Sequence, residues 1–127
     1  MKTALLSVDD DRLVLTALRL QLNRYYSDTH YLEFAQGAEE GFEIVEELRL
    51  RGVKTVLVIS DWIMPGMNGD VFLTKLRKRY PDITCMMLTG QASGAETETF
   101  IGSGIASMVL EKPWTEKALI DTINELI

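Results

Sequence analysis

The sequence has little of what several classes of protein require. It holds one cysteine, Cys85, and one histidine, His30, among 127 residues. A lone cysteine cannot form an intramolecular disulfide, and a single Cys and His cannot supply the four ligands of a structural zinc site. No apolar run approaches the roughly 20 residues that cross a membrane as a helix. These absences predict a soluble protein of the cytoplasm, held together by its hydrophobic core.

Positive charge is also scarce. Thirteen lysine and arginine residues stand against nineteen aspartate and glutamate residues, which gives a formal net charge of −6. Nucleic-acid binding proteins neutralise phosphates with Lys and Arg, so direct contact with DNA or RNA is not expected of these residues. The N-terminal MKTALLSVDDD reaches acidic residues too early for a signal peptide. We therefore expect neither a nucleic-acid partner nor membrane attachment.

Short apolar runs alternate five times with longer segments whose apolar residues recur at helical spacing. Predicted strands cover 3–8, 31–34, 55–60, 83–88 and 107–110. Predicted helices cover 12–25, 38–51, 69–79 and 93–102, and a last helix begins at Thr115. This alternation predicts an α/β fold with five parallel strands in the order 2-1-3-4-5. The expected architecture is a flavodoxin-like, doubly wound (βα)5 three-layer sandwich formed by a single domain, 1–127.

The fourth helical segment is the weakest of these predictions. Residues 93–102, SGAETETFIG, contain two glycines and two threonines, and only Phe100 and Ile101 are strong apolar anchors. These residue types have low helix propensity. We expect a helix of low stability there, and a mobile one.

Polar side chains of types that can react or bind ligands follow the predicted strands. They are Asp9, Asp10 and Asp11 after the first strand, Asp61 after the third, Thr89 after the fourth and Lys112 after the fifth. Each has an ordinary structural interpretation, such as a helix N-cap for Asp11 or a surface charge for Lys112. In a doubly wound sheet, however, the carboxyl ends of the strands form one edge, where ligands bind. Their joint placement therefore predicts a site.

The first and third strands are neighbours in the predicted order, so Asp9 and Asp10 are expected to face Asp61. Mg²⁺ binds carboxylate oxygens and would relieve the repulsion among these groups. With the metal present, one carboxylate can attack phosphorus and form an aspartyl phosphate. Lys112 as a point charge and Thr89 as a hydroxyl donor would then hold the phosphoryl oxygens.

Four segments of the chain resemble the receiver domains of two-component response regulators. They are LLSVDDD, SDWIMPGMNG, MLTGQA and EKPW, which occur in the order of that family and span nearly the whole chain. The resemblance implies that Asp61 accepts a phosphoryl group from a sensor histidine kinase or a histidine phosphotransfer protein. A downstream effector domain or protein would receive the signal. Such a protein catalyses its own phosphorylation and dephosphorylation and is not an enzyme that turns over an external substrate.

The resemblance also implies residue roles. Asp10 and Asp61 would bind Mg²⁺ directly together with the main-chain carbonyl of Ile63, and Asp9 would assist through water. Thr89 and Lys112 would bind the phosphoryl oxygens.

The family has further features in its loops and in the conformational change that follows phosphorylation. The family has a cis peptide bond at the position of Lys112–Pro113, and Pro65, Gly66 and Gly69 would have structural roles in the loop. Phosphorylation would switch the face formed by the fourth helix, the fifth strand and the fifth helix. The family uses an aromatic residue three positions before the lysine for this switch, whereas this chain has Val109. We therefore expect the fourth helix to respond by repacking or ordering, without the movement of an aromatic ring.

Two other functions remain open at this stage. The pair Asp9 and Asp11 also resembles the nucleophile and acid of haloacid dehalogenase-type phosphohydrolases, in which Asp9 would carry the phosphoryl group. That interpretation leaves the Met-Pro-Gly-Met-Asn-Gly loop after Asp61 unexplained. A phosphorylation-independent protein-binding module on the same fold would not need the complete polar set. The sequence identifies neither the kinase nor the oligomeric state, and an output domain after Ile127 is an open possibility. The receiver interpretation accounts for the most residues.

Overall fold

A computed structural model describes residues 2–127, whose five strands form one parallel sheet in the order β2-β1-β3-β4-β5. The strands are β1 (Thr3–Val8), β2 (Tyr31–Ala35), β3 (Lys54–Ser60), β4 (Thr84–Thr89) and β5 (Met108–Glu111). The helices are α1 (Arg12–Tyr26), α2 (Ala38–Leu50), α3 (Gly69–Arg79), α4 (Gly94–Gly102) and α5 (Glu116–Leu126). The predicted α/β class and strand order are confirmed, and every predicted boundary lies within one residue of the observed one.

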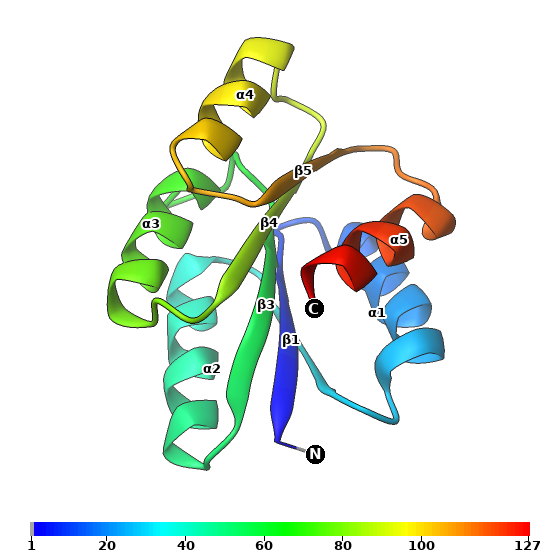
Figure 1. Ribbon diagram of the computed structural model, residues 1–127, viewed down its shortest axis with the longest axis vertical. Helices are drawn as coiled ribbons and strands as arrows, with labels where there is room; N and C mark the ends of the chain where they lie inside the picture. The colour runs from blue at the N-terminus through cyan, green and yellow to red at the C-terminus, as the bar shows by residue number, and fades with distance from the viewer. Residues whose placement is uncertain (1) are drawn as a thin grey trace.

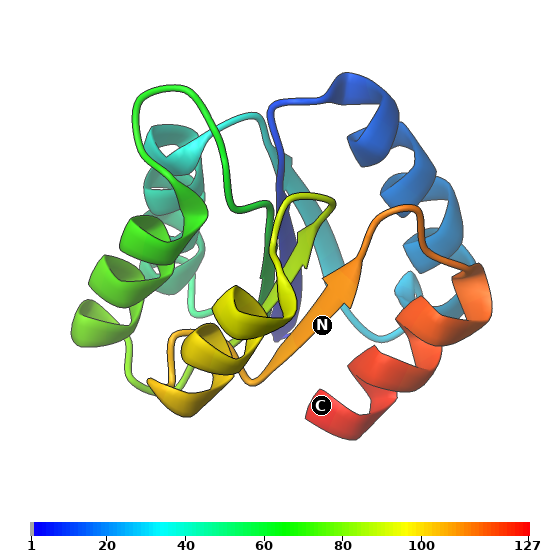
Figure 2. The ribbon, with the colours of Figure 1, turned by 90° about the horizontal axis from the view of Figure 1, so that it is seen from above.

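Helices cover both faces of the sheet (Figure 1). Viewed from above, α2, α3 and α4 lie on one side of the strands, and α1 and α5 lie on the other (Figure 2). Both faces of the central strands are therefore mostly apolar, with Ser7 and Thr55 among the buried polar exceptions. On β1, Leu6 and Val8 pack in the α2 and α3 layer, whereas Leu5 packs in the α1 and α5 layer. Burial raises the pKa of the Cys85 thiol in β4 to about 12, so this cysteine is an unreactive core residue.

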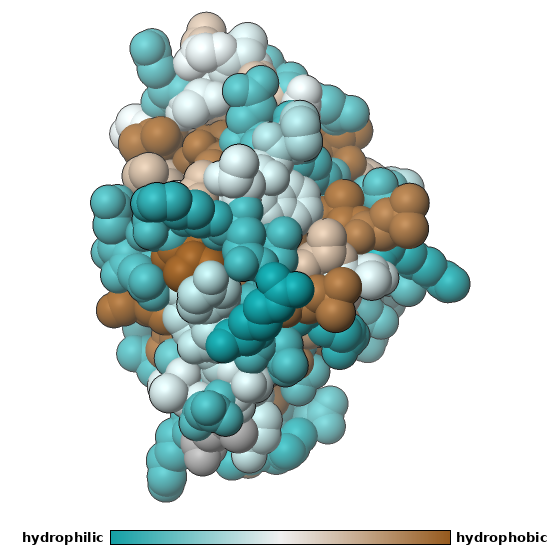
Figure 3. Space-filling view, turned by 90° about the vertical axis from the view of Figure 1, so that its right-hand side faces the viewer, coloured by the Kyte–Doolittle hydropathy of each residue, from teal (hydrophilic) through white to brown (hydrophobic). Residues whose placement is uncertain are grey.

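Hydrogen bonds between side chains join α5 to α1. The indole N–H of Trp114, just before α5, donates to Oε1 of Gln21 at 2.7 Å. The hydroxyl of Tyr26 donates to Oδ1 of Asn124, also at 2.7 Å. On this side of the molecule, apolar residues form separate patches among polar ones (Figure 3). Across residues 2–127, every helix is too short or too polar to cross a bilayer.

A capping box starts α4 despite the low helix propensity of its sequence. The backbone N–H of Glu96 donates to Oγ of Ser93, and Oε1 of Glu96 accepts from the backbone N–H of Ser93. The S-x-x-E pattern that predicts this motif is present in the sequence, and an argument from propensity alone overlooks it. Within α4, all of which the structure describes, Phe100 is the one buried residue. The helix is confirmed, and its mobility stays a prediction.

Candidate functional site

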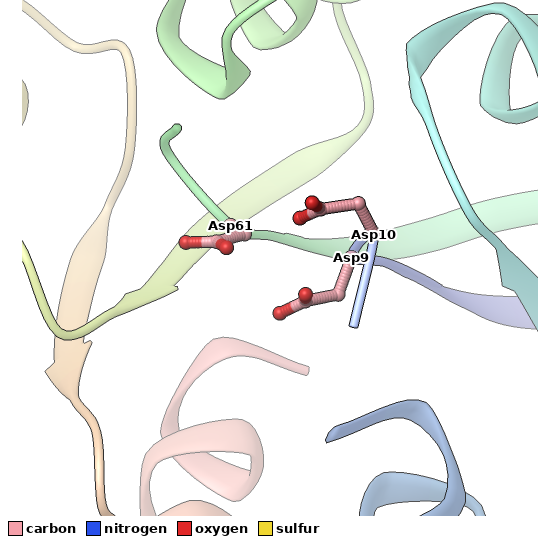
Figure 4. A group of neighbouring side chains, drawn as sticks. All are labelled: Asp9, Asp10 and Asp61. Carbon is pink, nitrogen blue, oxygen red and sulfur yellow. The ribbon is translucent and has the colours of Figure 1, made fainter. Parts of the chain in front are cut away.

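Three carboxylates meet at the carboxyl edge of the sheet. Asp9 and Asp10 follow β1, Asp61 follows β3, and one oxygen of each lies within 4.8 Å of the others. The side chains of Asp9 and Asp10 extend toward the side on which Asp61 lies (Figure 4). The strands bring them together because β1 and β3 are neighbours and Val8 pairs with Ser60 in the parallel register. The structure thus groups the three aspartates as the sequence predicts.

Lys112 joins this group from the end of β5. Its Nζ lies 2.7 Å from Oδ2 of Asp9 and 3.2 Å from Oδ2 of Asp61. Its backbone N–H donates to the carbonyl of Thr89, which places the end of β5 beside the end of β4. The peptide bond from Lys112 to Pro113 is cis, as the resemblance implies. One ammonium group therefore pairs with two of the three carboxylates.

Burial makes the ionised form of Asp9 unfavourable. The residue is only 2% exposed. This burial raises the pKa of Asp9, the hydrogen bonds from Lys112 and the Asp11 backbone lower it, and the charge of Asp61 raises it again, with a net increase. Burial by itself lowers the pKa of Lys112, but the hydrogen bond and charge of Asp9, together with Asp61, outweigh that effect and raise it. The ammonium group stays charged at neutral pH, and the cluster still has an excess of carboxylates.

We expect Asp9→Asn to change the pH dependence of stability in a metal-free buffer. The pKa of Asp9 in the folded chain lies above its ordinary value of 3.8, so ionisation disfavours the folded state. The contribution of this group to stability is full below the unfolded pKa and is lost as the pH rises through the folded pKa. Urea unfolding with a chelator, at pH values on both sides of this window, should show the parent losing stability relative to Asp9→Asn as pH rises. A difference that is constant with pH would contradict the prediction.

The backbone around Asp61 holds its carboxylate in place. Its own N–H donates to the carbonyl of Val8 at 2.9 Å, and the N–H of Trp62 donates to its Oδ1 at 2.7 Å. The following loop then folds back, so that the N–H of Gly69 donates to the carbonyl of Trp62 at 2.5 Å. Asp61 is only partly accessible, with 12% of its side chain exposed. The carboxylate is thus preorganised and still reachable.

Two glycines, Gly66 in the loop after Asp61 and Gly69 at the start of α3, serve different purposes. Gly66 has a φ of 84°, the left-handed conformation that side chains rarely adopt, so its expected role in the turn is confirmed. Gly69 has an ordinary φ but lies so close to Asp61 that an added Cβ would be 1.8 Å from the Asp61 carbonyl oxygen. Close approach of the chain to itself, and not the turn, requires glycine at position 69. The sequence indicates the residue and not this reason.

Thr89 and Ile63 are two further residues of the predicted site. Thr89 ends β4 and is buried, and its hydroxyl accepts from the backbone N–H of Gln91 at 3.3 Å. Ile63 lies in the loop after Asp61 with its side chain exposed. The roles of the Thr89 hydroxyl and the Ile63 carbonyl rest on the family resemblance and stay predictions.

Asp11 lies outside the cluster of three carboxylates. It is the N-cap of α1, where its Oδ1 accepts from the backbone N–H of Leu13 at 2.9 Å. This is the structural role that its position suggests from sequence. A phosphohydrolase mechanism would need the Asp11 carboxyl as an acid beside Asp9. The helix cap occupies that carboxylate instead, which disfavours the phosphohydrolase interpretation.

The chain is similar to receiver domains over nearly its whole length. A family model described as response regulator receiver domain matches residues 5–124. Sensor kinase CckA of Brucella abortus (strain 2308) is 34% identical over 125 residues, which are 98% of this chain and 12% of that protein. Chemotaxis protein CheY1 of Helicobacter pylori (strain J99 / ATCC 700824) is 32% identical over 126 residues, covering 97% of this chain and 95% of that protein.

A solved structure shows the same similarity in three dimensions. The response regulator receiver domain protein (CheY-like) from Methanospirillum hungatei JF-1 matches with a TM-score of 0.81 and 28% identity. The match covers 98% of this chain and 92% of that one. The chain therefore spans nearly the full length of CheY1 and of that solved chain but only a small part of the sensor kinase.

Proposed function

Because the chain belongs to the response regulator receiver family of two-component systems, we propose that Asp61 is its phosphoryl acceptor and that residues 1–127 form one receiver domain. One observation carries this proposal. The Asp61 carboxylate lies at the carboxyl edge of the sheet, 3.2 Å from the Lys112 ammonium and beside the carboxylates of Asp9 and Asp10. It is the one member of this group that is followed by a loop folded back onto its own backbone, which holds it in place.

In the proposed reaction, a carboxylate oxygen of Asp61 attacks the phosphorus of a phosphohistidine. The O–P bond forms as the P–N bond breaks, and the histidine nitrogen leaves as neutral imidazole after it takes up a proton. Lys112 offsets the negative charge of the phosphoryl oxygens, and Thr89 donates a hydrogen bond to one of them. The product is an acyl phosphate on the chain itself, and its hydrolysis restores the carboxylate. The chain is a reactant in its own modification and not an enzyme that acts on an external substrate.

The cluster formed by the carboxylates of Asp9, Asp10 and Asp61 fits a magnesium ion, because its donors are all hard oxygens that otherwise repel one another. Both oxygens of Asp9 already have partners: Oδ1 accepts from the Asp11 N–H and Oδ2 from Lys112. Asp61 also accepts from the Trp62 N–H and contacts Lys112, so these contacts alone do not separate the two carboxylates. On the family resemblance, we assign direct ligation to Asp10, Asp61 and the carbonyl of Ile63, and an indirect role through water to Asp9. When bound, Mg²⁺ would offset the charge of the carboxylates and the phosphoryl oxygens.

Mg²⁺ is expected to stabilise the parent chain against unfolding. A ligand that binds only the folded state adds about 2.7 kcal/mol when present at a hundredfold excess over its Kd. In Asp10→Asn, most of this gain should disappear, because a direct ligand has lost its charge. Asp11→Asn is the matched control, since it changes the neighbouring carboxylate and asparagine still caps a helix. Urea unfolding with and without Mg²⁺ measures all three; an equal gain in Asp10→Asn would contradict the assignment.

The proposed partners follow from this chemistry. A sensor histidine kinase or a histidine phosphotransfer protein supplies the phosphohistidine, and an effector domain or protein reads the modified state. Kinases of this type draw their phosphoryl group from cytoplasmic ATP, which favours the cytoplasm as the location of the chain.

Chemical phosphorylation followed by peptide mapping tests the proposed function. The chain is incubated with acetyl phosphate with and without Mg²⁺, and the acyl phosphate is reduced with borohydride to mark the modified aspartate for mass spectrometry. Modification at Asp61 that depends on Mg²⁺ is the expected result. Modification at Asp9 would support the phosphohydrolase alternative. Absence of any Mg²⁺-dependent modification would support the protein-binding module.

A further inference from the structure

We propose that Trp62 and Phe100 act as a positioning pair through which the chemical state of Asp61 is coupled to α4. This inference rests on the proposed function, because it takes Asp61 as the phosphoryl acceptor. It assigns to two aromatic side chains the connection between the site and the helix that the family resemblance places at position 109, where this chain has valine.

The two rings make an edge-to-face contact. Their centroids are 5.1 Å apart and their planes are inclined by 72°. Phe100 is 5% exposed and is the one buried residue of α4, so it is the main apolar anchor of that helix. Trp62 packs against the same core cluster from the loop that follows β3. The contact therefore joins the site loop to α4 at the single point where α4 enters the core.

Trp62 is also tied directly to the reacting carboxylate. Its N–H donates to Oδ1 of Asp61 at 2.7 Å, and its carbonyl accepts from the N–H of Gly69 at 2.5 Å. Both of its backbone polar groups are thus engaged within the site loop. Any change at Oδ1 of Asp61 acts on the backbone that carries the Trp62 ring, and the ring transmits it to Phe100.

Phosphorylation changes the strength of this hydrogen bond. A carboxylate is a charged acceptor, and charge-assisted hydrogen bonds are about twice as strong as neutral ones. An acyl phosphate has a neutral carbonyl oxygen in place of that acceptor, so the bond from Trp62 weakens. The Trp62–Phe100 contact and the hydrogen bond from Trp62 to the free Asp61 carboxylate therefore both stabilise the unphosphorylated arrangement of the site loop and α4. By linkage, weakening the ring contact must favour the phosphorylated state.

The face expected to switch consists of α4, β5 and α5, and the contacts of β5 and α5 direct the response to α4. Trp114, at the start of the α5 segment, is hydrogen-bonded to Gln21 of α1, so α5 is fixed to a helix on the opposite face of the sheet from α4. Val109 of β5 has no ring to contribute. The helix that depends on one buried side chain is the one expected to move.

Phe100→Leu tests the coupling, because it keeps an apolar anchor and removes the ring contact. Beryllofluoride, a stable mimic of the phosphoryl group, is titrated in the presence of Mg²⁺ and followed by ¹⁹F NMR. Phe100→Leu should bind the mimic about two- to tenfold more tightly than the parent, the range expected from the worth of an aromatic pair. Phe42→Leu is the matched control, since it breaks a similar edge-to-face pair, with Phe72 at 4.9 Å and 74°, that lies between α2 and α3. Its affinity should equal that of the parent.

Amide exchange and a double-mutant cycle separate coupling from simple loss of packing. In the parent, the mimic should increase exchange within residues 93–109, and in Phe100→Leu this increase should be smaller. Trp62→Leu should raise mimic affinity as Phe100→Leu does, and the double variant should add little to either.

Two results would overturn the inference while leaving the proposed function in place. One is mimic affinity in Phe100→Leu that is equal to or lower than that of Phe42→Leu, and the other is unchanged exchange over residues 93–109 in a parent that binds the mimic. A parent that does not bind beryllofluoride at all would overturn the proposed function together with the inference.

Discussion

Asp61→Asn is expected to abolish phosphorylation by acetyl phosphate and to leave the fold intact. The amide is not a nucleophile toward phosphorus and has no charge with which to hold Mg²⁺. Its Oδ1 can still accept from the Trp62 N–H, so the local backbone keeps its support. Lys112 loses one carboxylate partner and keeps the shorter contact with Asp9, at 2.7 Å. The rate of labelling should fall by at least about 1,000-fold, as for the loss of a nucleophile. Mass spectrometry of the reduced chain measures it.

The control for this prediction is Asp11→Asn. Asp11 is three residues from the end of β1 and caps α1, and the structure leaves it outside the carboxylate group. Labelling of this variant should match the parent. If Asp61→Asn instead kept full labelling while Asp11→Asn lost it, the nucleophile would be Asp9 and the phosphohydrolase mechanism would be correct.

Gly69→Ala is expected to have the largest effect on stability of any single methyl group added to the site. The new Cβ would lie 1.8 Å from the Asp61 carbonyl oxygen and 2.9 Å from Oγ of Ser60. The carbonyl is backbone at the end of a buried strand and cannot move aside, so the loop must move and the Gly69 hydrogen bond to Trp62 must stretch. We expect the free energy of unfolding to fall by about 3 kcal/mol or more. Urea denaturation measures this change.

Gly94→Ala is the matched control for Gly69→Ala. Both glycines lie in the first turn of a helix, but no heavy atom of the described residues outside that turn lies within 4 Å of a Cβ at position 94. Alanine there should be neutral or should stabilise the chain by up to about 1 kcal/mol. A similar change of stability in both variants would contradict this explanation, because helix propensity alone favours alanine over glycine at both positions.

Sequence periodicity determined the layers of this protein for a simple reason. A strand that is buried on both faces is a short apolar run, and a helix that covers it repeats its apolar residues every three or four positions. Parallel strands all end at the same edge, so residues that follow the strands are brought together by topology alone. The sequence alone therefore groups Asp9, Asp10, Asp61 and Lys112, and the family motifs agree with that grouping.

Tertiary structure decided which members of the group contact one another and how the group is connected to the rest of the chain. Lys112 pairs with Asp9 and Asp61, Asp11 turns away to cap a helix, Gly69 approaches the Asp61 backbone, and the Trp62 ring meets Phe100. Each contact joins side chains or backbone whose separation depends on how helices, loops and strands pack. Periodicity reports which face of an element is buried, whereas a distance of a few ångströms between two elements is set by packing across many residues.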